Sequence, residues 1–383
     1  MRWVRFVLAT SLLLGACSRG PVEDEPSSPS DRPVDSPTVA PVGAVLADGT
    51  PLPDGCTGGA GATHTVAFVA DDRAWALDPT DGEAACLFPV DDPGPFAWGP
   101  QGDRVVLGDF EIRGIDADAP DLPPVDEQLR AFDWGHPLGL AVVFADEEGD
   151  PRKRFVDDGR VVRLVSLPAG RYLEVAYHPS GLALAFVVES AEGQEIWLST
   201  NEGEDPQRLV FSDVGTEFTS LAFTPNGRTL WWTAQHGEGY PALHWMKLAD
   251  RTGFGTGWQG DTGTVAGGLR LAPEGSLKAV TLGAACAKRR AIIVDGRRTV
   301  ATLPEEGRPT EALGWLDRTT LLVSVGGCGE PLDLYAVHGL GEDAPATLVL
   351  GVDLAAPRTE VTDPPDEVPV PSIEEEPPLA GVG

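Results

Sequence analysis

The chain has 383 residues, with 28 Lys and Arg against 59 Asp and Glu, and a formal charge of −31 at pH 7. This charge argues against a nucleic-acid-binding protein, because affinity for a polyanion rests on Lys and Arg, and it argues equally against a basic membrane-surface patch. The 42% hydrophobic content allows a buried core, while 46 Gly and 35 Pro favour short elements separated by turns.

The N-terminus has the pattern of an exported protein. Two basic residues, Arg2 and Arg5, precede an apolar run over residues 6–14 that is too short to span a bilayer. The run ends in Leu14-Gly15-Ala16-Cys17, which resembles a bacterial lipobox. The resemblance implies cleavage before Cys17 and a lipid on Cys17, so acyl chains would anchor the protein in the cell envelope, on the extracytoplasmic side of a bacterial membrane. The alternative is an ordinary secretory signal cut after Ala16.

Composition then divides the chain into four parts. Residues 1–16 are expected to be the signal peptide, and residues 17–44, rich in Pro, Ser and acids, a semi-extended tether. Residues 45–358 carry the folded domain. Residues 359–383 are rich in Pro and acids and are expected to form a disordered tail.

A repeat of about 43 residues fills the middle of the chain. An aromatic residue or Leu is followed by a small or polar residue, Pro, any residue, Gly and a β run, as in 177–188 and 223–233. Pro fixes φ and Gly accepts a positive φ, so this step predicts a tight turn between two strands. The anchors of the six copies, two of them degraded, are spaced 36 to 48 residues apart: Trp98, Trp134, Tyr177, Phe223, Leu271 and Trp315.

Four short strands per repeat predict an all-β fold, a β-propeller with seven four-stranded blades. Residues 64–88 supply the last three strands of the first blade. Strands from the two chain ends would close the ring, with residues 45–52 or 347–352 as the candidates. Six blades are the alternative, if residues 64–88 form an accessory hairpin.

The repeats are similar to WD40-like repeats of the TolB type, on residues 177–198 and 223–232. This resemblance implies an extracytoplasmic propeller that serves as a rigid binding platform. It does not extend to TolB itself, because the chain shows no separate N-terminal α/β domain. A narrower resemblance, of residues 76–82 to the Ala-Leu-Asp step of quinoprotein-like propellers, implies an outer-membrane assembly lipoprotein; an ordinary turn between strands explains the same residues.

Four cysteines remain once Cys17 is assigned to lipid, and export permits disulfides. Cys286 and Cys328 each follow the second strand of neighbouring blades, so their loops should lie side by side and form one disulfide. Cys56 and Cys86 bracket the first hairpin unit and would form the other. A metal site is the alternative, but no Cys-x-x-Cys or Cys/His cluster supports it.

Candidate chemistry is sparse. The six histidines form no metal motif, and His136 and His178 precede the Pro of a turn. Asp116, Asp118 and Glu127 fall at positions 1, 3 and 12 of a calcium loop. An ordinary acidic loop explains them better, since Pro120 stands at position 5 and Asp121 replaces the Gly of position 6. We therefore expect no cofactor and no metal, with Ca²⁺ as the one ion to consider.

These observations favour a non-enzymatic, monomeric propeller that binds a protein or envelope component, with no nucleic-acid partner. Two alternatives stay open. One is a hydrolase of glycans or peptides with carboxylates converging at the axial channel. The other is an assembly-factor lipoprotein of the quinoprotein-like type.

Overall fold

The computed structural model describes the chain between residues 52 and 357, with gaps. The predicted signal peptide, Cys17, the predicted tether and the predicted acidic tail lie outside it. The described residues are 52–53, 55–56, 58, 66–70, 72–78, 83–90, 97–98, 104–107, 111–115, 121–122, 133–134, 141–145, 151–155, 158–164, 166–212, 215–237, 239–249, 254–262, 264–273, 276–283, 285–303, 308–327, 330–338, 346–352 and 354–357.

The described residues form an all-β structure of seven antiparallel sheets, six with four strands and one with three. The strands of a sheet follow one another in sequence, with one exception at the chain end. The first sheet contains β1 (Val66–Ala70), β2 (Arg73–Leu77) and β3 (Ala84–Pro89), together with β27 (Leu354–Pro357). The second sheet contains β4 (Ala97–Trp98), β5 (Arg104–Leu107) and β6 (Glu111–Gly114). The third sheet contains β7 (Asp133–Trp134), β8 (Ala141–Ala145), β9 (Pro151–Phe155) and β10 (Val161–Arg163).

The other four sheets have longer strands. The fourth sheet contains β11 (Arg171–Tyr177), β12 (Ala183–Ser190), β13 (Gly193–Thr200) and β14 (Gln207–Phe211), and the fifth contains β15 (Thr216–Phe223), β16 (Thr229–His236), β17 (Pro241–Lys247) and β18 (Phe254–Gln259). The sixth sheet contains β19 (Ala266–Leu271), β20 (Leu277–Leu282), β21 (Arg290–Asp295) and β22 (Arg298–Leu303). The seventh sheet contains β23 (Thr310–Trp315), β24 (Leu321–Gly327), β25 (Glu330–Val337) and β26 (Ala346–Val352). A single 3₁₀ turn, η2 (Cys286–Lys288), separates β20 from β21.

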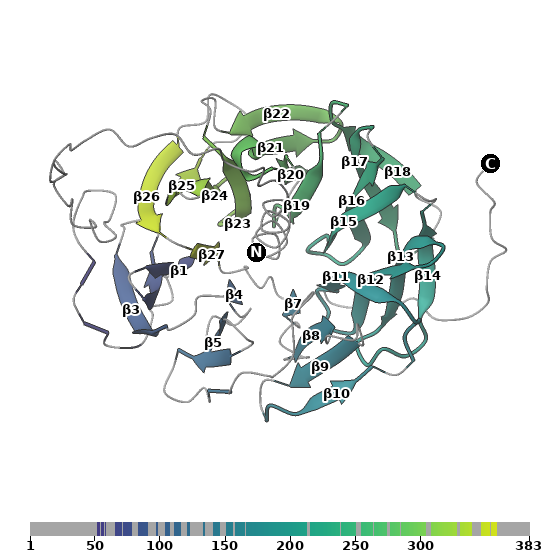
Figure 1. Cartoon of the computed structure of the whole chain (residues 1–383), viewed down its shortest axis with the longest axis horizontal. Coiled ribbons are helices and arrows are strands. Elements are labelled where there is room, and N and C mark those ends of the chain that lie inside the picture. Colours follow the sequence, from purple (N-terminus) through teal and green to yellow (C-terminus); the bar gives the residue numbers. More distant parts are fainter. Residues whose placement is uncertain are drawn as a thin grey trace, which may run out of the picture.

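The sheets are arranged around a common centre (Figure 1). The strand nearest to it is β27 in the first sheet and the first strand in chain order in each of the others. These inner strands contact one another in succession, in the order β7, β11, β15, β19, β23, β27 and β4. Radial antiparallel sheets with consecutive strands are the architecture of a β-propeller. The chain therefore has a propeller fold.

The repeat anchors mark the ends of the inner strands. Each of the six is the last residue of the first strand in its sheet, from Trp98 in β4 to Trp315 in β23. The Pro-x-Gly step then makes the turn: Gly181 and Gly227 have φ of 71° and 67°, and each amide donates a hydrogen bond of 2.8 Å to the carbonyl three residues earlier. Positive φ is costly for any residue with a Cβ, which explains the Gly.

The degraded copy after Trp315 keeps its turn by another route. Oδ1 of Asp317 accepts hydrogen bonds from the amides of Thr319 and Thr320, at 2.6 and 2.7 Å. Burial would raise the pKa of this carboxyl, but the hydrogen bonds from the two threonines outweigh it and hold the pKa below its ordinary value. A side-chain turn thus replaces the missing Pro and Gly.

The two chain ends share one sheet, whose order is β27-β1-β2-β3. The strand that pairs with β1 is Leu354–Pro357, so the candidates at 45–52 and 347–352 were wrong: Leu52 is in no described strand, and residues 347–352 belong to β26, the fourth strand of the last four-stranded sheet. Residues 64–88 form no separate hairpin, because β1, β2 and β3 are three strands of this sheet.

Apolar side chains fill the spaces between adjacent sheets. Phe218 and Trp232 pack with Ala185 and Ile196 of the preceding sheet, and Trp258 packs with Val280 and Ile292 of the following one. Hydrogen bonds from backbone amides also join neighbouring sheets, at the β-bulges that interrupt the inner strands. There the amides of Phe218, Leu269 and Ala312 donate to Gln194 Oε1, Ser220 Oγ and Thr281 Oγ1 of the preceding sheet, at 2.6, 3.1 and 3.1 Å.

Candidate binding pocket

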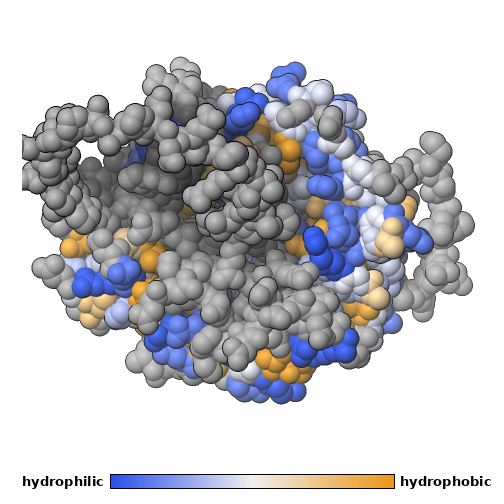
Figure 2. Space-filling model, viewed as in Figure 1, coloured by the Kyte–Doolittle hydropathy of each residue, from blue (hydrophilic) through white to orange (hydrophobic). Residues whose placement is uncertain are grey.

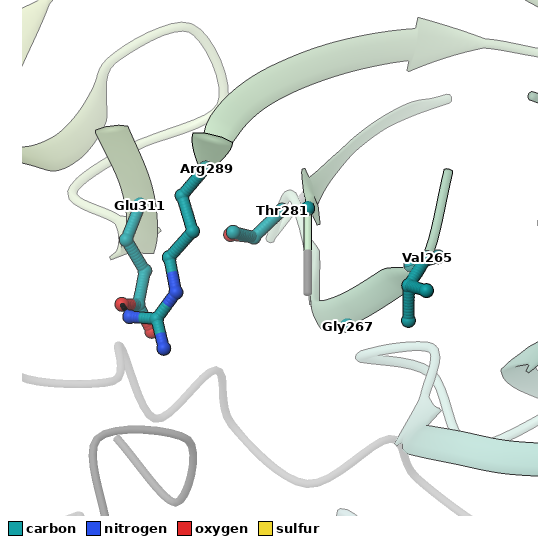
Figure 3. A pocket seen from close by; sticks show the side chains of 7 residues that line it. Val265, Gly267, Thr281, Arg289 and Glu311 are labelled. Carbon is teal, nitrogen blue, oxygen red and sulfur yellow. Dashed lines mark hydrogen bonds and ion pairs between the residues drawn. The ribbon is translucent and has the colours of Figure 1, made fainter. Parts of the chain in front are cut away.

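A small pocket lies between the sixth and seventh sheets in chain order, at the end where second strands pass into third strands. Its enclosed volume is about 10 Å³, room for roughly one water molecule, and it is partly open to solvent. Figure 3 shows Thr281, Arg289 and Glu311 on one side and Val265 and Gly267 on the other. Its seven lining residues are Val265, Ala266, Gly267, Thr281, Gly283, Arg289 and Glu311.

The backbone of Arg289 is fixed on both sides. Its amide donates to the carbonyl of Cys286 at 3.1 Å, which closes η2, and its carbonyl accepts from the amide of Thr310 at 2.9 Å. Thr310 begins β23, so this bond joins the loop of one sheet to the inner strand of the next. Cys286 is itself disulfide-bonded. The guanidinium of Arg289 thus extends from a firmly held position.

Arg289 and Glu311 form a buried ion pair. Arg289 Nη1 lies 2.8 Å from Glu311 Oε2, and only 10% and 9% of the two side chains are exposed. The second guanidinium nitrogen, Nη2, is buried and has no hydrogen-bond partner within the described structure. Thr281 Oγ1 accepts the amide hydrogen of Ala312 and keeps its own hydroxyl hydrogen for another acceptor. In Figure 3 this hydroxyl points toward the Arg289 side chain.

The polar groups that line the pocket are few. The residues that line the pocket include donors and one carboxylate, but no Ser, Cys or His that could serve as an activated nucleophile or a base of neutral pKa. A buried donor without a partner costs free energy in the unliganded protein. A water molecule that accepts a hydrogen bond from Nη2 would recover that cost.

Basic residues lie close in sequence to two of the lining residues, in an otherwise acidic chain. Lys288 and Arg290 flank Arg289, and Arg308 lies two residues before Thr310. We call Lys288, Arg290 and Arg308 the basic rim. Arg308 pairs with Asp333 at 2.7 Å and Arg290 with Asp261 at 4.0 Å, while Lys288 is exposed. Figure 2 shows apolar residues on the described part of the viewed face in small areas among hydrophilic ones.

A second cluster of titratable rings lies at the same end of the preceding sheet. The ring centres of His236 and His244 are 5.7 Å apart, and His244 stacks on Trp232 at 5.8 Å. Burial, and secondarily the charge of His236, lower the pKa of His244 to about 4. His244 is therefore neutral at pH 7. Within the described residues, no three His, Cys, Asp or Glu side chains are grouped so as to hold a metal ion.

The structure describes some of the predicted site residues. Cys56 and Cys86 form a disulfide, with Cα atoms 4.4 Å apart. Cys328, the expected partner of Cys286, lies outside the described residues, as do Cys17, Asp116, Asp118 and Glu127. Asp121, in the same acidic loop, accepts a hydrogen bond from the amide of Gly114 at 2.9 Å. No helix within the described ranges is long and apolar enough to cross a membrane.

Sequence reasoning missed the Arg289–Glu311 pair. The two residues are 22 positions apart and come from different sheets, so no local pattern joins them. The available signal was the run Lys288-Arg289-Arg290, which stands out in a chain of charge −31.

Comparisons with known proteins support the fold and no more. No protein-family model matches the sequence, and no curated protein matches it. Among solved structures, the chain is similar to a prolyl endopeptidase at a TM-score of 0.56 and 12% identity, over 77% of this chain and 49% of that one, so it spans about half the length of that enzyme. It is also similar to the Swd1 β-propeller domain of Myceliophthora thermophila, at a TM-score of 0.48 and 16% identity, over 67% of this chain and 84% of that one. A third similar structure is TolB from Acinetobacter baumannii, at a TM-score of 0.45 and 12% identity, over 78% of this chain and 68% of that one.

Proposed function

We propose that this protein is a lipid-anchored, seven-bladed propeller that binds a protein or envelope component outside the cytoplasm and carries out no reaction on it. The observation that carries the proposal is the propeller fold, a rigid scaffold of radial sheets that holds its connecting loops in place as a binding surface. The succession of inner strands and the pairing of β27 with β1 support closure of seven sheets into one ring.

The anchor is proposed from the lipobox at Cys17. Fractionation of cells tests it: the native chain and a Ser18→Ala control should sediment with membranes, whereas Cys17→Ala should appear in the soluble extracytoplasmic fraction. Retention of Cys17→Ala in the membrane would refute the lipid anchor.

Binding is tested by photo-crosslinking in the membrane-anchored protein. A photoreactive residue at position 290, in the basic rim, should capture a partner. The matched control is position 182, because Leu182 is 44% exposed but lies at the opposite, Pro-x-Gly end of its sheet. Capture at neither position, together with turnover of a glycan or peptide by the purified protein, would overturn the proposal in favour of a hydrolase.

A further inference from the structure

Cys286 and Cys86 both belong to disulfides, but their surroundings differ. Cys86 is 2% exposed and lies among apolar side chains of the first and seventh sheets, while its partner Cys56 is exposed. Cys286 is half-buried at the start of η2, between two exposed alanines. Its disulfide partner lies outside the described residues, since Cys56 and Cys86 are bonded to each other. The two disulfides therefore release very different thiols when they are reduced.

The charges beside Cys286 favour its release as a thiolate. A disulfide breaks when a thiolate attacks one sulfur and the other sulfur leaves, and a stabilised thiolate leaves faster. Lys288 follows Cys286 by two residues, is exposed and forms no ion pair within the described ranges, and Arg289 comes next. Nearby cations stabilise a thiolate, whereas apolar surroundings such as those of Cys86 destabilise it. Cys286 is therefore the better leaving group.

Carboxylates at the same end of the sixth and seventh sheets oppose this effect. Glu311 pairs with Arg289 and Asp261 with Arg290, the latter at 4.0 Å from a carboxylate whose side chain is 90% exposed. The other acids of the connections at this end have side chains outside the described residues: Glu305, Glu306 and Glu330. The contribution of Lys288 is therefore measured directly, with the variant given below.

The turn η2 connects Cys286 to the seventh sheet. The amide of Arg289 donates to the carbonyl of Cys286 at 3.1 Å, and the carbonyl of Arg289 accepts from the amide of Thr310 at 2.9 Å. The guanidinium of the same residue forms the buried ion pair with Glu311. Because the disulfide restricts the backbone at Cys286, it also restricts the position of Arg289 against β23.

We propose that the disulfide of Cys286 is a redox-sensitive latch: a dithiol reduces it before Cys56–Cys86, and its reduction loosens the contact between η2 and β23. A thiolate of the dithiol attacks the sulfur bonded to Cys286, forms a mixed disulfide there and releases the Cys286 thiolate. The second thiol of the dithiol then displaces the other protein sulfur and closes a cyclic disulfide. Two electrons and two protons pass from the dithiol to the two protein cysteines. This inference goes beyond the proposed binding function and does not depend on it.

Limited reduction of the purified full chain with dithiothreitol at neutral pH tests the order of reduction. Samples are quenched with acid, unfolded and alkylated, so that burial in the folded protein does not hide a thiol. Peptide mapping then gives the alkylated fraction of Cys286 and of Cys86 at each time. We expect Cys286 to be reduced at least about tenfold faster than Cys86. Reduction of Cys86 first, or of both at one rate, would overturn the proposal.

A charge variant tests the cause. Lys288→Gln removes a cation that has no described carboxylate partner, and should slow the reduction of Cys286 at least about twofold. The matched control is Lys247→Gln, which removes an exposed lysine from β17 and should leave the rate unchanged. An unchanged rate in Lys288→Gln would overturn the electrostatic basis of the latch.

Hydrogen exchange, followed by peptide mass spectrometry, tests the loosening. After selective reduction, peptides that contain Arg289 and Thr310 should exchange at least about tenfold faster, and Cys286→Ser should reproduce this change without a reductant. Exchange at Phe218, whose amide donates from the fifth sheet to the fourth, should stay the same. Unchanged exchange at Thr310 in the reduced chain and in Cys286→Ser would overturn the latch, as would an equal increase at Phe218.

Discussion

The imidazole of His178 bridges two adjacent sheets, with its Nε2 atom 2.9 Å from the carbonyl oxygen of Gly227. Its Nδ1 accepts the amide hydrogen of Ser180 at 3.1 Å, so Nε2 carries the ring hydrogen and donates it to Gly227. His178 is buried, and both residues belong to Pro-x-Gly turns. The repeated turn is therefore also a contact between neighbouring sheets.

Gly227→Ala should be strongly destabilising. Its φ is 67°, and a Cβ there would lie 2.3 Å from His178 Nε2, whose ring is fixed by its hydrogen bonds. We expect a loss of about 3 kcal/mol or more in the free energy of unfolding, measured by denaturant titration. Gly296→Ala is the control, because Gly296 has a φ of 57° with nothing within 4 Å of the new Cβ, and should cost only about 1 kcal/mol. Equal losses would contradict the packing argument.

Because the ammonium of Lys153 is buried, we expect removal of its partner Glu202 to cost more stability than removal of Lys153 itself. Lys153 is 1% exposed and lies 3.0 Å from Glu202, whose side chain is 54% exposed. Glu202→Gln leaves the buried charge without its carboxylate and should cost about 1–2 kcal/mol. Lys153→Met removes the buried charge and should cost less, because Glu202 can turn to solvent. The comparison is made by thermal and denaturant unfolding, and a larger loss in Lys153→Met would refute it.

His244 predicts a loss of stability in mild acid. Its folded pKa of about 4 lies below the ordinary 6.5, so the unfolded chain binds the proton more readily. The stability that the neutral ring provides is present above pH 6.5 and declines as the pH falls toward 4, by about 3 kcal/mol. His244→Phe keeps a ring on Trp232 and removes this titration. Its unfolding free energy should therefore fall less between pH 7 and pH 4 than that of the native chain; parallel curves would exclude His244 as the cause.

The pairing of Cys286 with Cys328 remains a prediction that peptide mapping can test. Digestion without reduction should yield one linked peptide pair containing Cys56 and Cys86, and another containing Cys286 and Cys328. Cys328→Ser should leave Cys286 open to alkylation and lower the free energy of unfolding by about 2–4 kcal/mol. A different partner for Cys286 in the map would disprove the pairing.

The repeat made much of the fold predictable. A Pro-x-Gly turn constrains φ at two positions whatever surrounds it, so the ends of the inner strands at Tyr177 and Phe223 could be located from sequence. In contrast, β27 has the sequence Leu-Ala-Ala-Pro, which carries no alternating pattern and becomes a strand by pairing with β1.

The pocket was not predictable in the same way. Its ion pair depends on how η2 places Arg289 against β23, and contacts between sheets leave no periodic trace in the sequence. Lys153 and Arg154 are likewise buried in β9, although their charges would normally indicate an exposed strand.

The pairing of β27 with β1 has a consequence for biogenesis. The first sheet to be synthesised acquires its innermost strand only from residues 354–357, after every other described strand has been made. Until the ribosome reaches that point, β1 has no partner on one side. The first sheet therefore cannot be completed until almost the whole described part of the chain has been synthesised.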